Sequence, residues 1–278
     1  MKKMVTFILA AAFMSMNAQA QEKFPFDVKI SGSGAGSIIF IPGLSCSGDV
    51  WNETVAKFNK EYTCYVLTFH GFAGAAPDDT ASFKGWENEI ARYIREHTIS
   101  KPVIVGHSIG GGMALLLAAD YPELISKIVV VDALPCLSAI RNPNFISNPH
   151  PDCTPFIQRF TGMTDAQFYL MQKQTMPSLI ADTVHLKDAL QWSVSSDRKT
   201  VAEIYCRFLN LDLRDTLSAI QCPSLILLES AFKEMQAAIS GQYEKLKNAK
   251  LQYADKGLHF IMYDDPDWYF KQLDQFLK

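Results

Sequence analysis

The sequence predicts an α/β fold with a mostly parallel central sheet, helices on both faces and an inserted helical cap. Short, β-branched apolar runs alternate with longer segments of helical periodicity, which is typical of β-α-β units. This alternation stops in the middle of the chain and then resumes. One strand-to-helix junction carries the pentapeptide Gly106-His-Ser-Ile-Gly110.

Each element follows from a local pattern. The expected strands are 26–30, 37–41, 62–69, 102–105, 127–131, 224–228 and 250–253, and the expected core helices are 83–97, 109–120, 236–246 and 268–277. The first two strands flank a Gly-rich turn at 31–36. In the first of these helices, Phe83, Trp86, Ile90 and Ile94 recur at helical spacing, so one face is expected to be buried.

Between residues 133 and about 212 the strand pattern is absent, and Pro, Asn, Met and amphipathic helix dominate. We therefore predict a core of residues 21–136 and 213–278 and a cap of residues 137–212. Asp212 and Arg214 are expected to pair where the chain returns to the core. Apolar cap residues are expected to form the cap's own core first and a pocket wall second. They are Phe156, Phe160, Met163, Phe168, Tyr169, Met171, Met176, Trp192 and Tyr205.

The N-terminus resembles a bacterial secretory signal peptide, residues 1–20. Lys2 and Lys3 precede an apolar run at 4–16, and Ala18-Gln19-Ala20 follows. The run is shorter than the ~20 residues that cross a bilayer, so we expect cleavage after Ala20 rather than a membrane span. The mature protein is expected to be periplasmic or secreted.

The charge of the chain argues against one class of partner. The net charge is −3 and Lys and Arg form no block, so nucleic acid is not an expected partner.

The chain has six cysteines and no C-x-x-C motif. We expect Cys64, Cys206 and Cys222 to be buried thiols, and Cys136 and Cys153 to be the pair that forms a disulfide in an oxidising compartment.

Ser108 is the candidate nucleophile. It is the centre of a G-x-S-x-G sequence at the end of a buried strand and the start of a helix, which is the setting of a nucleophile elbow. The helix N-terminus favours the negative charge that develops during attack on a carbonyl.

His259 is the candidate general base, because a serine hydroxyl needs a base with a pKa near neutrality. It follows the last strand, at the same sheet edge as Ser108. His70 follows a strand at that edge too, but it precedes the serine and is expected to line the pocket instead. The histidines show no metal-ligand spacing, and the Ser–His mechanism implies neither a metal nor an organic cofactor.

With these residues in place, the chain resembles the α/β-hydrolase superfamily, in particular its capped esterase, epoxide-hydrolase-like and haloperoxidase-like branch. The matching segments are Ile41-Pro-Gly43, Thr68-Phe-His-Gly-Phe-Ala-Gly74, the elbow, Val131-Asp-Ala-Leu-Pro135, Asp212-Leu-Arg214 with Cys222-Pro-Ser-Leu-Ile-Leu227, and His259-Phe260 with Asp265-Pro266. Epoxide hydrolases and dehalogenases of that family carry Asp at the elbow, whereas this chain carries Ser108. The resemblance implies the α/β-hydrolase fold and an oxyanion hole formed by the backbone N–H groups of Ile109 and Leu44. The family usually has His-Gly where this chain has Pro42-Gly43.

The acid of the triad departs from the family pattern. An Asp usually follows the Pro-led strand 224–228, but the segment Glu229-Ser-Ala-Phe-Lys-Glu234 contains none. We prefer Asp132, directly after strand 127–131, with Glu234 as the first alternative and Glu229 as the second. Each choice keeps the order Ser, acid, His along the chain.

We therefore expect a serine hydrolase that acts through an acyl-enzyme on an ester-like bond of a small, apolar substrate. The same triad could serve a C–C hydrolase, a cofactor-free haloperoxidase side activity or an aminopeptidase of the proline-iminopeptidase type. An aminopeptidase of that type needs carboxylates in the cap that bind the amine of the substrate. The cap has only scattered carboxylates, such as Asp152, Asp165 and Asp182. A non-catalytic binding protein with this fold is the remaining alternative. Acyl length and oligomeric state stay open.

Overall fold

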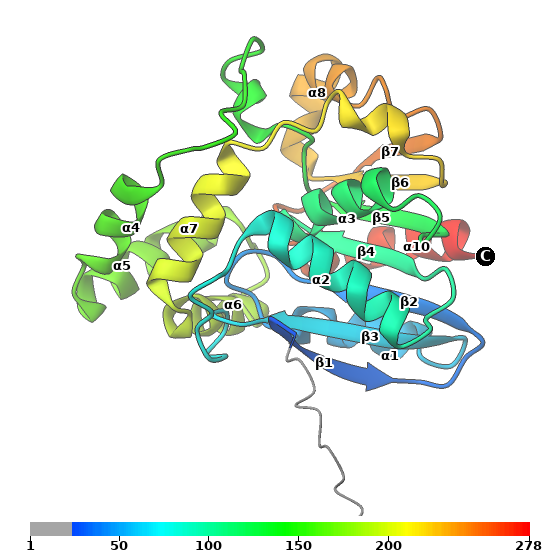
Figure 1. Cartoon of the computed structure of the whole chain (residues 1–278), viewed down its shortest axis with the longest axis horizontal. Helices are drawn as coiled ribbons and strands as arrows, with labels where there is room; N and C mark the ends of the chain where they lie inside the picture. The colour runs from blue at the N-terminus through cyan, green and yellow to red at the C-terminus, as the bar shows by residue number, and fades with distance from the viewer. Residues whose placement is uncertain (1–23) are drawn as a thin grey trace, which may run out of the picture.

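The computed structural model describes residues 24–278 and contains a seven-stranded sheet of order β1-β3-β2-β4-β5-β6-β7 (Figure 1). The strands are β1 (Phe26–Ser31), β2 (Gly36–Ile41), β3 (Tyr62–Phe69), β4 (Val103–His107), β5 (Lys127–Val131), β6 (Ser224–Leu228) and β7 (Ala249–Tyr253). The pair β1–β3 is antiparallel and the other pairs are parallel. The predicted fold class is confirmed, and each predicted strand overlaps an observed one.

Helices cover both faces of the sheet because strand side chains alternate between them. In β5, Ile128 and Val130 join one apolar cluster and Val129 and Val131 join the other. The first cluster includes side chains of α2 (Phe83–Glu96), α3 (Ile109–Asp120) and α8 (Gln236–Gln242). The second includes η1 (Gly48–Trp51), α1 (Asn52–Phe58), α9 (Ile261–Asp264) and α10 (Pro266–Leu277). Both faces are therefore desolvated, as a parallel sheet requires.

The segment that we interpret as the cap lies between β5 and β6. Its helices are η2 (Leu137–Ile140), α4 (Thr154–Thr161), α5 (Asp165–Thr175), η3 (Met176–Ser178), α6 (His185–Ser195) and α7 (Arg198–Leu209), and η4 (Thr216–Ala219) follows in the core. Figure 1 shows α4 to α7 gathered beyond the end of the sheet to which the arrow of β3 points. The carboxyl ends of the parallel strands therefore face the cap.

The expected Cys136–Cys153 disulfide is wrong, because Cys153 is bonded to Cys206. Helices α4 and α7 pack together, and this brings the two Cα atoms to 5.7 Å although the residues are 53 apart in sequence. Cys206 is therefore not the free thiol that we expected. Cys136 is a buried free thiol in the core, and its backbone N–H donates to Gln242 Oε1.

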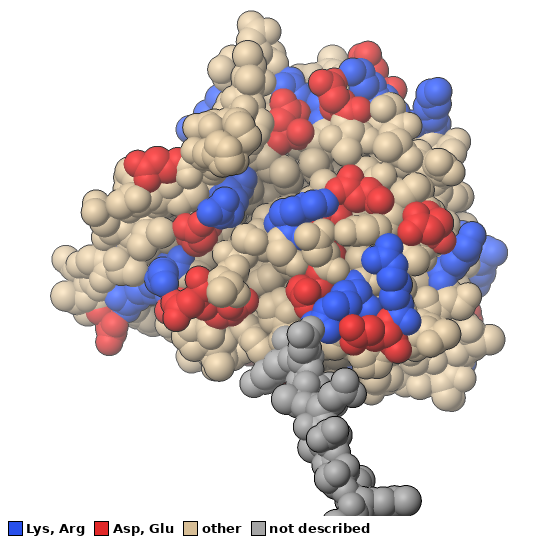
Figure 2. Space-filling view, in the orientation of Figure 1, with Lys and Arg blue, Asp and Glu red and all other residues tan. Residues whose placement is uncertain are grey.

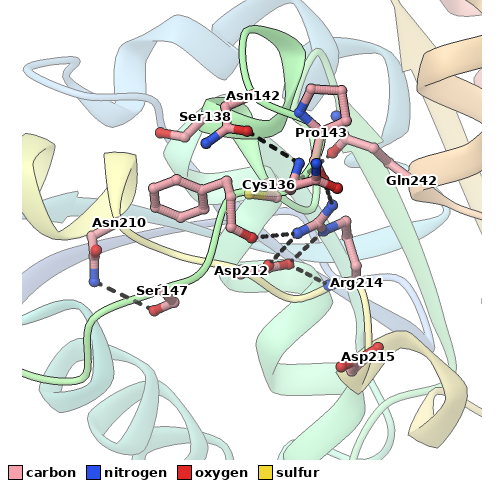
Figure 3. Close-up of polar contacts among 12 residues, drawn as sticks. Cys136, Ser138, Asn142, Pro143, Ser147, Asn210, Asp212, Arg214, Asp215 and Gln242 are labelled. Carbon is pink, nitrogen blue, oxygen red and sulfur yellow. Dashed lines mark hydrogen bonds and ion pairs between the residues drawn. The ribbon is translucent and has the colours of Figure 1, made fainter.

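The expected pairing of Asp212 with Arg214 is confirmed (Figure 3). Arg214 Nε and Nη2 donate to the two oxygens of Asp212 at 2.9 and 2.6 Å. The guanidinium also donates to the carbonyl oxygens of Pro143 and Phe145. The pair therefore fixes the long connection after η2 against the point where the chain re-enters the core.

On the face shown in Figure 2, Lys and Arg are interspersed with Asp and Glu. Among residues 24–278, no helix is long and apolar enough to cross a membrane. The same residues contain no group of three His, Cys, Asp or Glu side chains arranged to hold a metal ion. The signal peptide that we predict lies outside the described residues.

Candidate active site

Ser108 is held in a strained turn between β4 and α3. Its backbone has φ 55° and ψ −121°, a region that residues with a Cβ rarely adopt and that costs about 1–3 kcal/mol. The N–H of Ser108 donates to Val131 O at 2.9 Å, and its carbonyl accepts from Gly111 and Gly112. These hydrogen bonds hold both ends of the turn, and the Ser108 side chain lines a cavity between the core and the cap.

The two glycines of the elbow permit contacts that no side chain would allow. A Cβ on Gly106 would lie 2.0 Å from the carbonyl oxygen of Gly110. A Cβ on Gly110 would lie 2.4 Å from the carbonyl oxygen of Ile41. Both obstacles are backbone atoms, so the G-x-S-x-G spacing is a steric requirement of this turn.

His259 contacts Asp132, the acid that we preferred. Its Nδ1 lies 2.6 Å from Asp132 Oδ2, and the Asp132 side chain is almost fully buried. The other oxygen, Oδ1, accepts from the N–H of Glu229 at 2.7 Å. A buried carboxylate accepts a hydrogen bond from Nδ1–H, so this contact keeps the ring proton on Nδ1 and places the free lone pair of His259 on Nε2.

The alternative acids occupy different places. Glu234, in η5 (Ser230–Met235), is exposed and does not line the cavity. Glu229 does line it, and a signal for this was available, because Glu229 directly follows β6 at the same sheet edge as Asp132. Its side chain forms no hydrogen bond or ion pair with the described residues.

The expectation that His70 lines the pocket is wrong. His70 follows β3, which is separated from β4 by β2, and its Nε2 lies 3.6 Å from Asp27 Oδ1. The chain then turns at Gly71, where φ is 84°. His70 therefore faces the side of β1 rather than the cavity.

His107 supports the loop that carries His259, a role that the sequence did not reveal. Its Nε2–H donates to the carbonyl oxygen of His259 at 3.0 Å, and the two rings lie 4.5 Å apart. Burial, together with the neighbouring His259, holds the pKa of His107 well below its ordinary value of 6.5. A neutral His107 does not repel a protonated His259.

A cavity of about 450 Å³ lies between core and cap, and Ser108, His259 and Asp132 all line it. The core contributes Leu134, Phe232 and Phe260. The cap contributes Phe160, Met171, Met176, Leu179 and Tyr205. We had expected the apolar cap residues to form the cap's own core, and for Phe160, Met171, Met176 and Tyr205 this is only part of their role. Phe168 is buried against Phe160, whereas Tyr169 is exposed.

Two backbone N–H groups are available to an oxyanion at this cavity. Ile109 and Leu44 both line it. Within the described part of the chain, neither N–H donates a hydrogen bond to the protein. Gly43, which precedes Leu44, packs closely against the elbow, since a Cβ there would lie 3.3 Å from the Cβ of Ser108.

Cys46 is a further cavity residue that the sequence did not reveal. Its thiol lies 3.5 Å from the carbonyl oxygen of Leu44, and burial raises its pKa to about 12. A thiol with such a pKa is protonated at neutral pH and is a poor nucleophile. Ser108 is therefore the better placed nucleophile of the two.

The chain matches the sequence model of the alpha/beta hydrolase family over residues 38–272. It is 27% identical over 203 residues to the pimeloyl-[acyl-carrier protein] methyl ester esterase of Vibrio cholerae serotype O1, covering 72% of this chain and 76% of the relative. It is 23% identical over 245 residues to the protein of the same name from Vibrio vulnificus strain YJ016, covering 86% and 93%.

Solved structures agree on the fold. An enol-lactonase from Burkholderia xenovorans LB400 superposes with a TM-score of 0.75 at 17% identity, covering 91% of this chain and 96% of its own. An esterase from Exiguobacterium antarcticum gives 0.76 at 16% identity, covering 90% and 94%. The chain therefore belongs to the alpha/beta hydrolase family.

Proposed function

We propose that this protein is a serine hydrolase that cleaves esters of small, apolar acids through an acyl-enzyme. One observation carries the proposal. A single apolar cavity is lined by Ser108, by the hydrogen-bonded pair His259–Asp132, and by two residues whose backbone N–H groups donate no hydrogen bond to the described protein. The curated relatives named as methyl ester esterases support an ester as the substrate class.

In the proposed acylation each group has one role. His259 Nε2 accepts the Ser108 proton as the hydroxyl attacks the ester carbonyl, and Asp132 stabilises the imidazolium that forms. The N–H groups of Ile109 and Leu44 hold the oxyanion, and loss of one such donor typically costs ~10²–10³-fold in kcat. His259 then protonates the departing alcohol.

Deacylation repeats these steps with water. His259 takes a proton from the water molecule that attacks the acyl-Ser108 carbonyl, and the same N–H groups hold the second oxyanion. Ser108 recovers its proton and the carboxylic acid leaves. The triad alone supplies the proton transfers, and no step draws on a metal or cofactor.

The test is hydrolysis of p-nitrophenyl esters over a range of acyl lengths by the wild type and by Ser108→Ala and His259→Ala. We expect turnover by the wild type and loss of nearly all of it in both variants. Equal activity in the wild type and Ser108→Ala would refute the proposal. A wild type that is inactive on esters but cleaves a diketone or an amino-terminal proline would assign the triad to another bond.

We also propose that the protein is exported after cleavage behind Ala20. The charged and apolar pattern of residues 1–20 supports this, and so does the Cys153–Cys206 disulfide, since such bonds persist in oxidising compartments. The intact mass of protein recovered from the periplasm should correspond to a chain that begins at Gln21. A full-length mass in the cytoplasm would contradict export.

A further inference from the structure

The Glu229 side chain is a polar group of the cavity that the proposed mechanism does not use. It lines the cavity with Ser108 and His259, directly after β6. Its backbone N–H is bound to Asp132, but its carboxyl forms no hydrogen bond or ion pair with residues 24–278. A half-buried carboxyl without a protein partner is available to a ligand.

The charge around Glu229 is one-sided. Among the described residues that line the cavity, Asp132 and Glu229 carry carboxyls and none is Lys or Arg. The other titratable groups on the cavity are Cys46, His107, Tyr205 and His259. Both oxygens of Asp132 are already engaged, so Glu229 is the carboxyl that an entering group would meet.

The protonation of Glu229 reflects these surroundings. Burial first, and then the charge of Asp132, raise its pKa to about 7, while His259 opposes the rise. A cationic group on a ligand would supply the missing partner and favour the ionised carboxylate. An anionic group would add a third negative charge to a cavity that has no basic side chain among its described residues.

We propose that the Glu229 carboxyl forms a charge-selective subsite that binds an ammonium group on the substrate and disfavours a carboxylate. The inference rests on the proposed ester hydrolysis and changes its substrate class from wholly apolar acids to acids whose apolar chain carries an amine. The preferred esters are those whose acyl chain carries an amine at a length that reaches Glu229. Phe232 and Leu134, which also line the cavity, provide an apolar surface for the methylene chain.

The kinetic test compares methyl esters of three matched series over several chain lengths: ω-amino, unsubstituted and ω-carboxy acids. Hydrolysis is followed by alkali uptake near pH 8 for the wild type, Glu229→Gln and Glu244→Gln. Glu244 is an exposed carboxylate, so its variant controls for the change in net charge. We expect the ratio of kcat/KM for the best amino ester to that for its carboxy counterpart to fall about 10- to 100-fold in Glu229→Gln. Glu244→Gln should keep the wild-type ratio.

The proposal would be overturned if Glu229→Gln kept the wild-type ratio of kcat/KM for amino and carboxy esters while activity on all three series fell together. The Glu229 carboxyl would then affect the triad and would not distinguish substrates by their charge. The wild type provides a second test that needs no variant. Its preference for the amino ester should rise as the pH passes through about 7 and Glu229 ionises. A preference that is independent of pH over that range would count against the subsite.

A binding measurement separates this inference from the proposed function, because it requires no turnover. Titration calorimetry of hexylammonium, hexanol and hexanoate into Ser108→Ala should show tightest binding of the cation and weakest binding of the anion. The order should collapse when Glu229→Gln is added. If esters are hydrolysed but hexanol and hexylammonium bind equally, the subsite is wrong and the hydrolase proposal stands. If no ester is hydrolysed but the cation binds through Glu229, the hydrolase proposal is wrong and the binding of an ammonium group by Glu229 stands.

Discussion

Replacement of Asp132 by Asn removes the negative charge that faces His259 and leaves the shape of the side chain nearly unchanged. The carboxylate accepts two hydrogen bonds, one from His259 Nδ1–H at 2.6 Å and one from the N–H of Glu229 at 2.7 Å. An amide has a single oxygen, so its NH₂ group must face one of these two donors. If it faces His259, the ring must carry its proton on Nε2, where it can no longer act as the base for Ser108. If it faces Glu229, a buried N–H loses its acceptor.

Both orientations carry a cost that follows from these contacts. A buried donor without a partner costs about 1–3 kcal/mol of stability, and each kcal/mol corresponds to about 2–4 °C in Tm for a chain of this size. The same Asp-to-Asn change in a serine protease lowers kcat by about 10⁴-fold. We therefore expect Asp132→Asn to remain folded with a Tm lower by about 2–12 °C and to lose about 10³- to 10⁴-fold in kcat.

The assay is p-nitrophenyl butyrate hydrolysis with Tm measured on the same samples, and Glu244→Gln serves as the exposed control. A kcat for Asp132→Asn within about tenfold of the wild type would refute the reasoning. The contact with His259 would then be structural, and Glu229 would be the next carboxyl to test.

Three further outcomes follow from the fold. Cys153→Ser, which breaks the bond to Cys206, should lower the free energy of unfolding by about 2–4 kcal/mol. The stability of this variant should no longer depend on added reductant, as that of the wild type does. A variant that is still destabilised by reductant would contradict the assigned disulfide. Gly106→Ala should cost about 3 kcal/mol or more in denaturant unfolding, since its Cβ would meet a backbone oxygen at 2.0 Å, and near-wild-type stability would contradict the elbow geometry. Burial raises the pKa of Glu229 from 4.5 to about 7, so the folded protein binds a proton that the unfolded chain has already released. The unfolding free energy of the wild type relative to Glu229→Gln should therefore fall as pH rises from about 4.5 to about 7, and a constant difference would contradict the raised pKa.

Much of the fold and part of the site could be predicted because the patterns are local. Alternating apolar runs define the strands, and the sheet-edge rule places residues that follow parallel strands, such as Asp132 and His259, near one another. Contacts between distant segments gave no local signal. Cys206 lies in an apolar helical pattern that is compatible with a free thiol, and only the packing of α4 on α7 brings it to Cys153. His70 obeys the same edge rule as His259, but the strand order moves it away from the cavity.

The central claim is that Ser108 is an activated nucleophile, and labelling with a fluorophosphonate tests it most directly. The probe forms a covalent adduct with a serine whose proton is taken by a neighbouring base. Intact mass and peptide mapping should show one adduct, on Ser108, in the wild type, and no adduct in Ser108→Ala or His259→Ala. A wild type that stays unlabelled, or an adduct on another residue, would contradict the account.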